Sequence, residues 1–211
     1  MVMKKLLILS FFVVLSGRLF AQNTMADLFS GKAKVVFLGL DFTQAKYIGS
    51  AGFMDAAAIQ SQHMVSWNNL IEFEPKKFSL VKPLKLKEEQ YVAKVGDMIK
   101  HNKSANVADN IINEEYNLTE DQVRKAVSKY SLSEKDGIGV VYVVESLSKT
   151  AEKMTAWVTF IDLSSKKILL TEKVEGKAGG FGFRNYWAGA VYKINENIGS
   201  KYYKKWSNSS K

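Results

Sequence analysis

GIGVVYVVESL, residues 137–147, is a near-continuous apolar run rich in valine. Such a run predicts a strand inside a sheet that is covered on both faces. The alternating segment KMTAWVTFIDL at 153–163 and the segment KKILLTEKV at 166–174 predict two further strands. Because the connections at 148–152 and 162–166 are short, and Asp and Ser in the second favour a turn, we expect an antiparallel meander.

The first strand of the domain is predicted upstream, at KVVFLGLDF, residues 34–42, which is apolar on both faces. The following residues, 43–52, contain two glycines and predict a loop. Asp55 is of a type that caps helices, and the alanines after it favour a helix that runs to about Glu72. The chain is therefore expected to begin with a strand, a loop and a helix.

The middle of the chain has weaker patterns. Residues 91–99 fit a helix or a strand, and a glycine in their middle favours the strand. Residues 78–86 have no clear pattern, and residues 102–117 are polar and predict a loop or a short helical turn. Thr119, followed three residues later by Gln122, forms a capping box, which predicts the start of a short helix.

A single apolar stripe predicts the last helix. Its residues recur at spacings of three and four: Trp187, Val191, Ile194, Ile198 and Tyr202. The predicted fold class is α+β, in the order β-α-β-α-β-β-β-α. Its helices are expected to pack on a mixed, largely antiparallel sheet of about five strands.

Composition excludes several kinds of site. The 211-residue chain has no cysteine, which excludes disulfides, thiolate metal sites and a cysteine nucleophile. Its two histidines, His63 and His101, have no pattern of metal ligands around them, and no hydrolase motif is present. A pair of carboxylates, Asp41 and Asp55, lies near a strand end, and we interpret them as a turn residue and a helix cap. No catalytic residue, metal ligand or cofactor is predicted, and an enzymatic role is not favoured.

Residues 1–21 predict a secretory signal peptide. Two lysines form a basic start, an apolar stretch follows at 6–15, and Ala21 is the small residue before the expected cleavage at Gln22. The apolar stretch is too short to span a membrane as a helix, and no later stretch is long enough. Because there is no cysteine to carry a lipid, the protein is expected to be periplasmic or secreted and not a lipoprotein.

Beyond the signal, residues 22–32 are small and polar and predict a flexible lead-in. We expect a single domain at 33–206 and a polar tail at 207–211. The net charge of +9 falls to +6 when the three basic residues of the signal are removed. Because the basic residues are spread along the chain, no nucleic-acid partner is expected. We interpret the charge as a solvated basic surface, and weak attraction to anionic glycans or lipid headgroups is the functional alternative.

The segment GKAGGFGFR, residues 176–184, joins the third meander strand to the last helix. Backbone N–H groups at a helix N-terminus bind anions, and two basic side chains lie nearby. An anion site is therefore predicted, formed by Lys177, Gly179, Gly180 and Arg184. The alternative is a tight turn in which the glycines supply positive φ angles, since neither nucleotide-binding glycine fingerprint is matched.

Aromatic residues also gather at this segment, at Phe181, Phe183 and Tyr186. Aromatic side chains of this kind usually belong to a core. Two phenylalanines separated by one glycine also fit an exposed patch that contacts a partner. These three residues are therefore the predicted interaction surface.

The meander and the last helix resemble a group of envelope proteins. The residues that carry the resemblance are VVYVVES at 140–146, VTFIDLSSKKILLTEKVEGKAGG at 158–180 and the helix that follows. They are similar to the group of curli secretion factors, penicillin-binding-protein activators and TolB N-terminal domains, with 34–42 as the opening strand. The segment GKAGGFGFRNYW at 176–187 and the end of the signal look like those of uncharacterised secreted proteins of Bacteroidetes-type bacteria. The resemblance implies a non-enzymatic envelope role, with protein contacts through sheet edges or loops.

Two functions remain open from the sequence. The first is an exported, non-enzymatic interaction module that contacts an envelope protein. The second is a binding protein for a small anionic ligand at Gly176–Arg184. A positively charged pocket at this segment favours the second function, and an exposed aromatic patch without a pocket favours the first. No oligomeric state is indicated.

Overall fold

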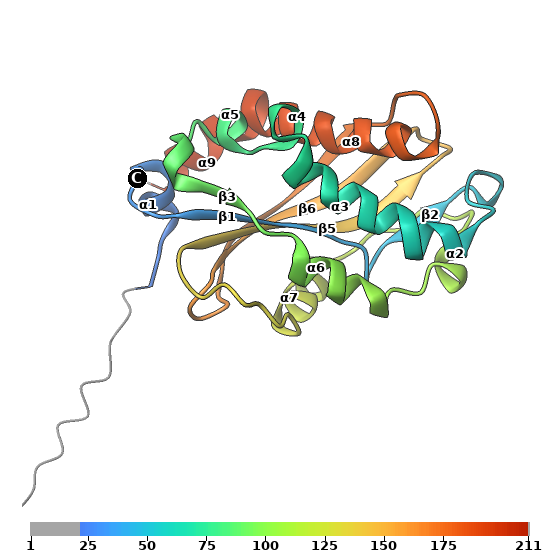
Figure 1. Cartoon of the computed structure of the whole chain (residues 1–211), viewed down its shortest axis with the longest axis horizontal. Helices are drawn as coiled ribbons and strands as arrows, with labels where there is room; N and C mark the ends of the chain where they lie inside the picture. The colour runs from blue at the N-terminus through green and yellow to red at the C-terminus, as the bar shows by residue number, and fades with distance from the viewer. Residues whose placement is uncertain (1–21, 211) are drawn as a thin grey trace, which may run out of the picture.

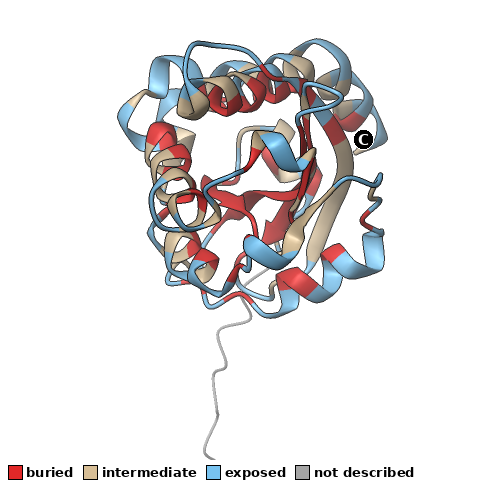
Figure 2. Cartoon of the chain, turned by 90° about the vertical axis from the view of Figure 1, so that its right-hand side faces the viewer, coloured by how far each residue is buried: buried red, intermediate tan, exposed pale blue. Residues whose placement is uncertain are grey.

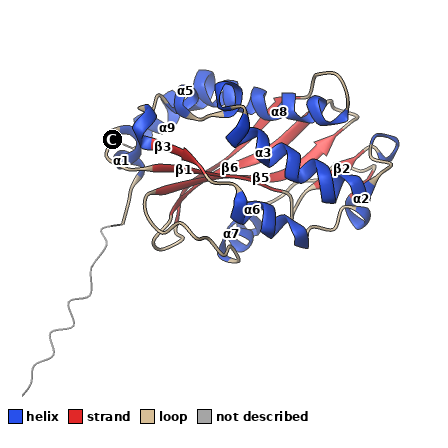
Figure 3. Ribbon diagram, in the orientation of Figure 1, coloured by secondary structure: helices blue, strands red, loops and turns tan. Residues whose placement is uncertain are grey.

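The computed structural model describes residues 22–210, so the predicted signal peptide at 1–21 lies outside the described residues. Within this range seven strands form one sheet, and helices cover both of its faces (Figure 1, Figure 3). Seen from the end of the molecule, the buried residues concentrate on the sheet and on the inner sides of the helices (Figure 2). The fold is therefore a sheet enclosed between two helical layers.

The strands are β1 (Val35–Asp41), β2 (Lys46–Ile48), β3 (Tyr91–Ala93), β4 (Ile111–Ile112), β5 (Ile138–Ser148), β6 (Lys153–Asp162) and β7 (Ile168–Lys177). The α-helices are α1 (Met25–Phe29), α2 (Ala56–Ala58), α3 (Met64–Phe73), α4 (Pro75–Phe78), α5 (Val81–Leu84), α6 (Gly96–His101), α7 (Glu120–Ser128), α8 (Phe183–Asn197) and α9 (Tyr203–Ser209). Two π-helical turns, η2 (Ile59–His63) and η6 (Ile198–Tyr202), join α2 to α3 and α8 to α9.

The sheet corrects the predicted one. Four of its six strand pairings are parallel: β1 pairs with β3 and β5, and β2 pairs with β4 and β5. The prediction of a largely antiparallel sheet of about five strands is therefore wrong, as is the simple order of elements, although the α+β class holds. β1 and β2 pair with successive stretches of one edge of β5, because β6 lines the other edge along its whole length. Strands β2, β3 and β4 have two or three residues each, too few to show a period.

The antiparallel meander of β5, β6 and β7 is confirmed. Its second turn forms as predicted, because the Asp162 carboxylate accepts hydrogen bonds from the hydroxyls of Ser164 and Ser165, each at 2.6 Å. The valine-rich β5 is buried along its whole length, as expected of a strand covered on both faces.

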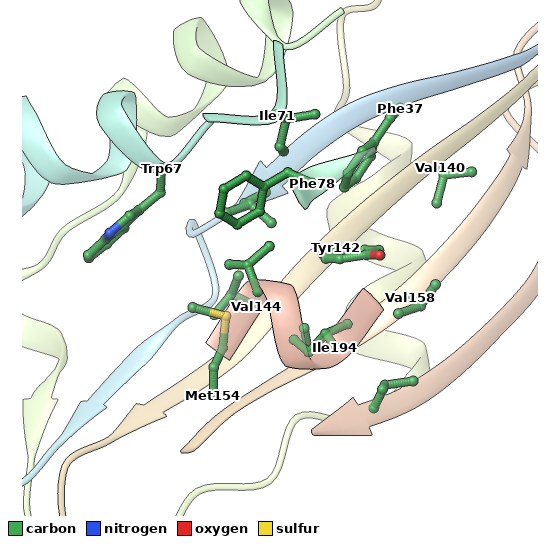
Figure 4. Packing of buried hydrophobic residues seen from close by; sticks show 14 of the residues in the cluster. Phe37, Trp67, Ile71, Phe78, Val140, Tyr142, Val144, Met154, Val158 and Ile194 are labelled. Carbon is green, nitrogen blue, oxygen red and sulfur yellow. The ribbon is translucent and has the colours of Figure 1, made fainter. Parts of the chain in front are cut away.

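Each face of the sheet has its own core. The larger core lies under α3, α4, α8 and α9, and in it side chains from β1, β5 and α8, among them Phe37, Tyr142 and Ile194, point toward one another (Figure 4). The smaller core lies under α6 and α7 and contains Val123 and Val127. Burial of the α8 stripe through Trp187, Val191, Ile194 and Ile198 confirms the predicted packing of the last helix.

Local helix signals were confirmed where they rest on capping. Asp55 accepts a hydrogen bond from the Ala58 amide at 2.8 Å, and Thr119 accepts one from the Gln122 amide at 3.3 Å. The stretch without a clear pattern contains the two short helices α4 and α5. At 91–99, where a strand was favoured, only β3 is a strand and α6 begins at Gly96.

The segment predicted as a lead-in contains α1, which packs on the domain. Met25 and Leu28 are buried, and the Phe29 ring lies 5.6 Å from the Tyr203 ring of α9. The segment predicted as a polar tail begins inside α9, which ends at Ser209. No helix within residues 22–210 is long and apolar enough to cross a membrane.

Strand β7 forms one edge of the sheet, because among residues 22–210 it pairs with β6 alone. Two of its outward backbone carbonyls accept hydrogen bonds from the helical layer. The Asn197 amide donates to the Glu175 carbonyl at 2.7 Å, and the Tyr202 hydroxyl donates to the Lys173 carbonyl at 3.4 Å. Side chains of the helical layer thus satisfy part of this edge.

Candidate functional site

Three loops meet at one end of the sheet. Strands β2, β5 and β7 run in the same direction, so the loops that follow them start at the same edge. The Lys149 amide bonds to the Ile48 carbonyl at 2.8 Å, and the Ala178 amide bonds to the Glu152 carbonyl at 2.7 Å. Ligands of sheets with parallel strands bind at the carboxyl ends of the strands, which makes this edge a candidate site.

The three loops and the start of α8 enclose a pocket of about 330 Å³. Its lining residues are Gly52, Lys149, Gly180, Gly182, Phe183, Tyr186 and Trp187, and together they are called the loop pocket below. Its volume is at the lower end of the range for small-molecule sites. No carboxylate is among the lining residues.

The N-terminus of α8 lines the pocket and has no side-chain cap. The N-cap is Gly182, at φ 79°, which has no side chain to accept a hydrogen bond, and no acidic residue lies in the first turn. Within the described residues, the backbone N–H groups of Phe183, Arg184 and Asn185 have no acceptor, whereas the Tyr186 amide bonds to the Gly182 carbonyl. The positive end of a 15-residue helix is therefore uncompensated.

Lys149 supplies a full positive charge to the loop pocket. Its Nζ lies 3.8 Å from the centroid of the Tyr186 ring. A side chain at Gly52 would come within 2.7 Å of Lys149 Cγ, so the glycine leaves room for the lysine stem. Among residues 22–210 no carboxylate forms an ion pair with Lys149.

Two buried donors at the pocket lack acceptors. The indole N–H of Trp187 and the hydroxyl of Tyr186 have no hydrogen-bond partner among the described residues. Trp187 is completely buried, and its ring stacks on Phe53 with the centroids 5.5 Å apart. Buried polar groups are nearly always satisfied in proteins, so these two donors are exceptions that coincide with the wall of the pocket.

The two basic residues predicted for the anion site do not lie in the loop pocket. Arg184 turns toward α3, where its Nε donates to Ser66 Oγ at 2.5 Å, and its guanidinium lies 3.9 Å from Glu74. Lys177 lines a separate hollow of about 630 Å³, together with Lys201 and Glu175 among others. The structure therefore does not place the Arg184 guanidinium at the loop pocket. Arg184 is the second residue of α8, and its side chain faces α3 instead.

The predicted aromatic surface is divided by its packing. Phe181 is 96% exposed. Phe183, in contrast, packs among His63, Phe53 and Trp187, with ring centroids 4.8 to 6.5 Å away. Tyr186 is half-buried beneath Lys149. Only Phe181 projects into solvent as an interaction residue would.

The glycines of the segment differ in what they do. Gly180 has φ 130°, which favours glycine, as the turn interpretation requires. At Gly179 a side chain would meet nothing within 4 Å. The close approach lies on the helix side, because a side chain at Gly189 would come within 2.0 Å of the Gly179 carbonyl oxygen. The segment is thus a packed turn that also borders a pocket.

The other candidate groups are structural. Buried Asp41 accepts hydrogen bonds from the Tyr130 hydroxyl at 2.6 Å and the Thr43 amide at 2.8 Å, and His101 Nε2 lies 3.8 Å away. Asp55 caps α2, as interpreted from the sequence. Within residues 22–210 no group of three or more potential metal-ligating side chains comes together.

Lys149 is the functional residue that the sequence analysis missed. It follows directly after β5, in a short connection that was treated only as a turn. The rule that sites gather at the ends of parallel strands would have found it, if β2 had been recognised as a partner of β5. Comparison of the chain with protein families, curated proteins and solved structures finds no significant match. The resemblance to envelope proteins therefore stays a prediction.

Proposed function

We propose that the protein is a non-catalytic binding module that holds a small anionic group in the loop pocket. One observation carries this proposal: every polar side chain that lines the pocket is a donor or a cation. Within residues 22–210 Lys149 has no carboxylate partner and the α8 N-terminus has no side-chain cap. A phosphate or carboxylate group in the pocket would offer acceptors to the Lys149 ammonium and to the free N–H groups at the start of α8.

A cationic or purely donating ligand is disfavoured at the same place. It would approach Lys149 and the positive end of α8 without a compensating negative charge. The pocket also has apolar walls from Phe183, Tyr186 and Trp187, which suit a ligand with an apolar part beside its anionic group. The proposed ligand class is therefore a small organic anion or the anionic end of a larger molecule.

The expected cellular setting is the envelope. The predicted export signal and the envelope-protein resemblance both favour a protein that works in the periplasm or outside the cell. An interaction module and an anion-binding module are compatible there, because the anionic group can belong to an envelope component. The proposal therefore joins the two functions that the sequence left open, and moves the positive charge from Arg184 to Lys149.

Thermal unfolding in the presence of anions tests the proposal. Phosphate, sulfate and glycerol 3-phosphate are titrated at constant ionic strength against chloride. A ligand at a hundred-fold excess over its Kd stabilises by about 2.7 kcal/mol, which raises the Tm by roughly 5–10 °C for a chain of this size. We expect such an increase for at least one of the phosphate-bearing probes.

A matched pair of variants locates the effect. Lys149→Met keeps the aliphatic stem against Gly52 and removes the charge, so it should abolish the anion-dependent increase in Tm. Lys177→Met makes the same change at the other hollow and should keep the increase. If no anion raises the Tm of the unmodified chain, or if Lys177→Met abolishes the increase and Lys149→Met does not, the loop pocket is not the site.

A further inference from the structure

Two large apolar side chains project from the loops that form the loop pocket. Met54 is 90% exposed and follows the β2 loop, and Phe181 is 96% exposed at the tip of the loop between β7 and α8. The two loops are in contact near these residues, because the ring centroids of Phe53 and Phe183 lie 6.0 Å apart. Both loops lie at the same end of the molecule, at the right-hand side of Figure 1.

The exposure of these two residues is not explained by packing. Within the same loops Phe53 is buried and Phe183 is half-buried, so the chain places alternate apolar residues inward and outward. Phe181 lies between Gly180 and Gly182, both with positive φ, and this backbone conformation holds the phenylalanine at the tip. A single exposed apolar side chain is common on protein surfaces, but here two of them, Phe181 and Met54, are exposed on neighbouring loops beside a pocket with a lysine in its wall.

The occupant is argued from the pattern of apolar and charged groups. A protein partner is recognised by a contiguous, well-packed patch with a central anchor. Here the apolar side chains stand singly on two loops, beside a pocket whose one charged lining residue is Lys149. A lipid surface matches this arrangement, because separate tips enter the acyl region while the charged groups stay at the level of the headgroup phosphates.

We infer that this end of the molecule docks on an anionic lipid surface. Phe181 and Met54 enter the interface, and the phosphate of one lipid headgroup occupies the loop pocket beside Lys149. The net charge of +6 that remains after removal of the three basic residues of the predicted signal adds long-range attraction to such a surface. This inference rests on the proposed function and names the anion-bearing partner.

Vesicle co-sedimentation of the expected mature chain, which begins at Gln22, tests the inference. The vesicles contain either phosphatidylglycerol with phosphatidylethanolamine or phosphatidylcholine alone. We expect binding to the phosphatidylglycerol vesicles. The partition should be roughly tenfold weaker for Phe181→Ser and for Met54→Ser, because each variant lacks an apolar side chain that enters the lipid interface. The control is Phe73→Ser, which removes an apolar side chain that is 75% exposed at the end of α3 and should leave binding unchanged. The chains begin at Gln22, the expected mature N-terminus, because the apolar stretch at 6–15 would bind vesicles by itself and hide the loss.

A second measurement separates this inference from the proposed function. Glycerol 3-phosphate is titrated into Phe181→Ser by thermal unfolding, and we expect the unmodified increase in Tm, because the pocket is intact. If the chain binds glycerol 3-phosphate but does not sediment with vesicles, the lipid surface is wrong and the anion pocket stands. If vesicle binding depends on Phe181 but not on Lys149, the tips stand and the pocket assignment fails. Equal sedimentation of Phe181→Ser, Met54→Ser and Phe73→Ser overturns the inference.

Discussion

Tyr130 donates its hydroxyl to the carboxylate of Asp41 at 2.6 Å, which ties the residues after α7 to the end of β1. Both side chains are buried, and burial together with the nearby Asp41 charge raises the pKa of Tyr130 well above its usual value. The phenol is therefore protonated at neutral pH and donates to the carboxylate. The hydrogen bond thus fixes Tyr130, which belongs to the smaller core, to the end of β1, and β1 leads into β2 and the loop that lines the candidate site.

Removal of this one hydroxyl should destabilise the protein measurably. Tyr130→Phe leaves the buried Asp41 carboxylate without one of its donors, and we expect a loss of about 1–3 kcal/mol in the free energy of unfolding. Urea denaturation measures it. Tyr192→Phe, which removes a hydroxyl from a tyrosine that is 37% exposed, should change stability by less than about 0.5 kcal/mol. Similar effects of the two variants would show that the buried contact does not contribute.

The two neighbouring glycines of the turn should respond differently to alanine. Gly180 has φ 130°, and an added side chain would meet the Asn185 carbonyl oxygen at 2.7 Å, so Gly180→Ala should lose more than about 1 kcal/mol. Gly179→Ala meets nothing within 4 Å and should be nearly silent. Thermal unfolding of the two variants compares them directly, and a reversed order would contradict the described turn.

Stability should fall in mildly acidic solution because of His63. Burial lowers the pKa of His63 below 6.5 despite the nearby Asp55 carboxylate, which raises it, and the Arg184 guanidinium lowers it further. The unfolded chain therefore takes up this proton more readily than the folded chain does. The contribution to stability is complete above pH 6.5 and is lost as the pH falls below that value. Urea midpoints at several pH values should decline less steeply for His63→Gln than for the unmodified chain, and equal slopes would exclude this role.

A second loss of stability is expected at lower pH, at the meander turn. Burial alone would raise the pKa of Asp162, but hydrogen bonds from Ser164, Ser165 and Asn23 outweigh it and lower the pKa from 3.8 to about 2. The carboxylate thus contributes about 1–2 kcal/mol above pH 4, which is lost as the pH falls toward 2.

Acid unfolding of Asp162→Asn tests this contribution. The variant should be less stable than the unmodified chain at pH 5, and the difference should shrink toward pH 2. Other carboxylates with a lowered pKa, such as Asp27 and Glu134, titrate in both proteins and cancel in the comparison. A difference that does not change with pH would indicate a cause other than ionisation of Asp162.

The sequence predicted the parts of the fold that long apolar patterns or capping residues determine. The runs of β5 and β6 and the stripe of α8 are long enough to show their period, and Asp55 and Thr119 begin helices by local hydrogen bonds. The short strands β2, β3 and β4 form because longer strands beside them offer hydrogen bonds, which no local pattern indicates. The parallel direction of these pairings was missed for the same reason.

The candidate site was predicted in part. The glycine segment and the start of α8 do border a pocket, because a helix N-terminus is visible in the sequence. Its cation was assigned to Arg184, the nearest along the chain, although the nearest in space is Lys149, on a loop that the pairing of β2 with β5 brings there. Only the order of strands in the sheet determines which loops meet.

The capped edge of β7 has a consequence for how copies of this protein behave in concentrated solution. An open strand edge is a template onto which further chains can add, and it leads to aggregates of cross-β type. Here the carbonyls of Lys173 and Glu175 already accept hydrogen bonds from Tyr202 and Asn197, and an incoming strand would have to displace both donors. The side chains of Asn197 and Tyr202 are thus expected to make this long, partly apolar edge a poor template for polymers at high protein concentration.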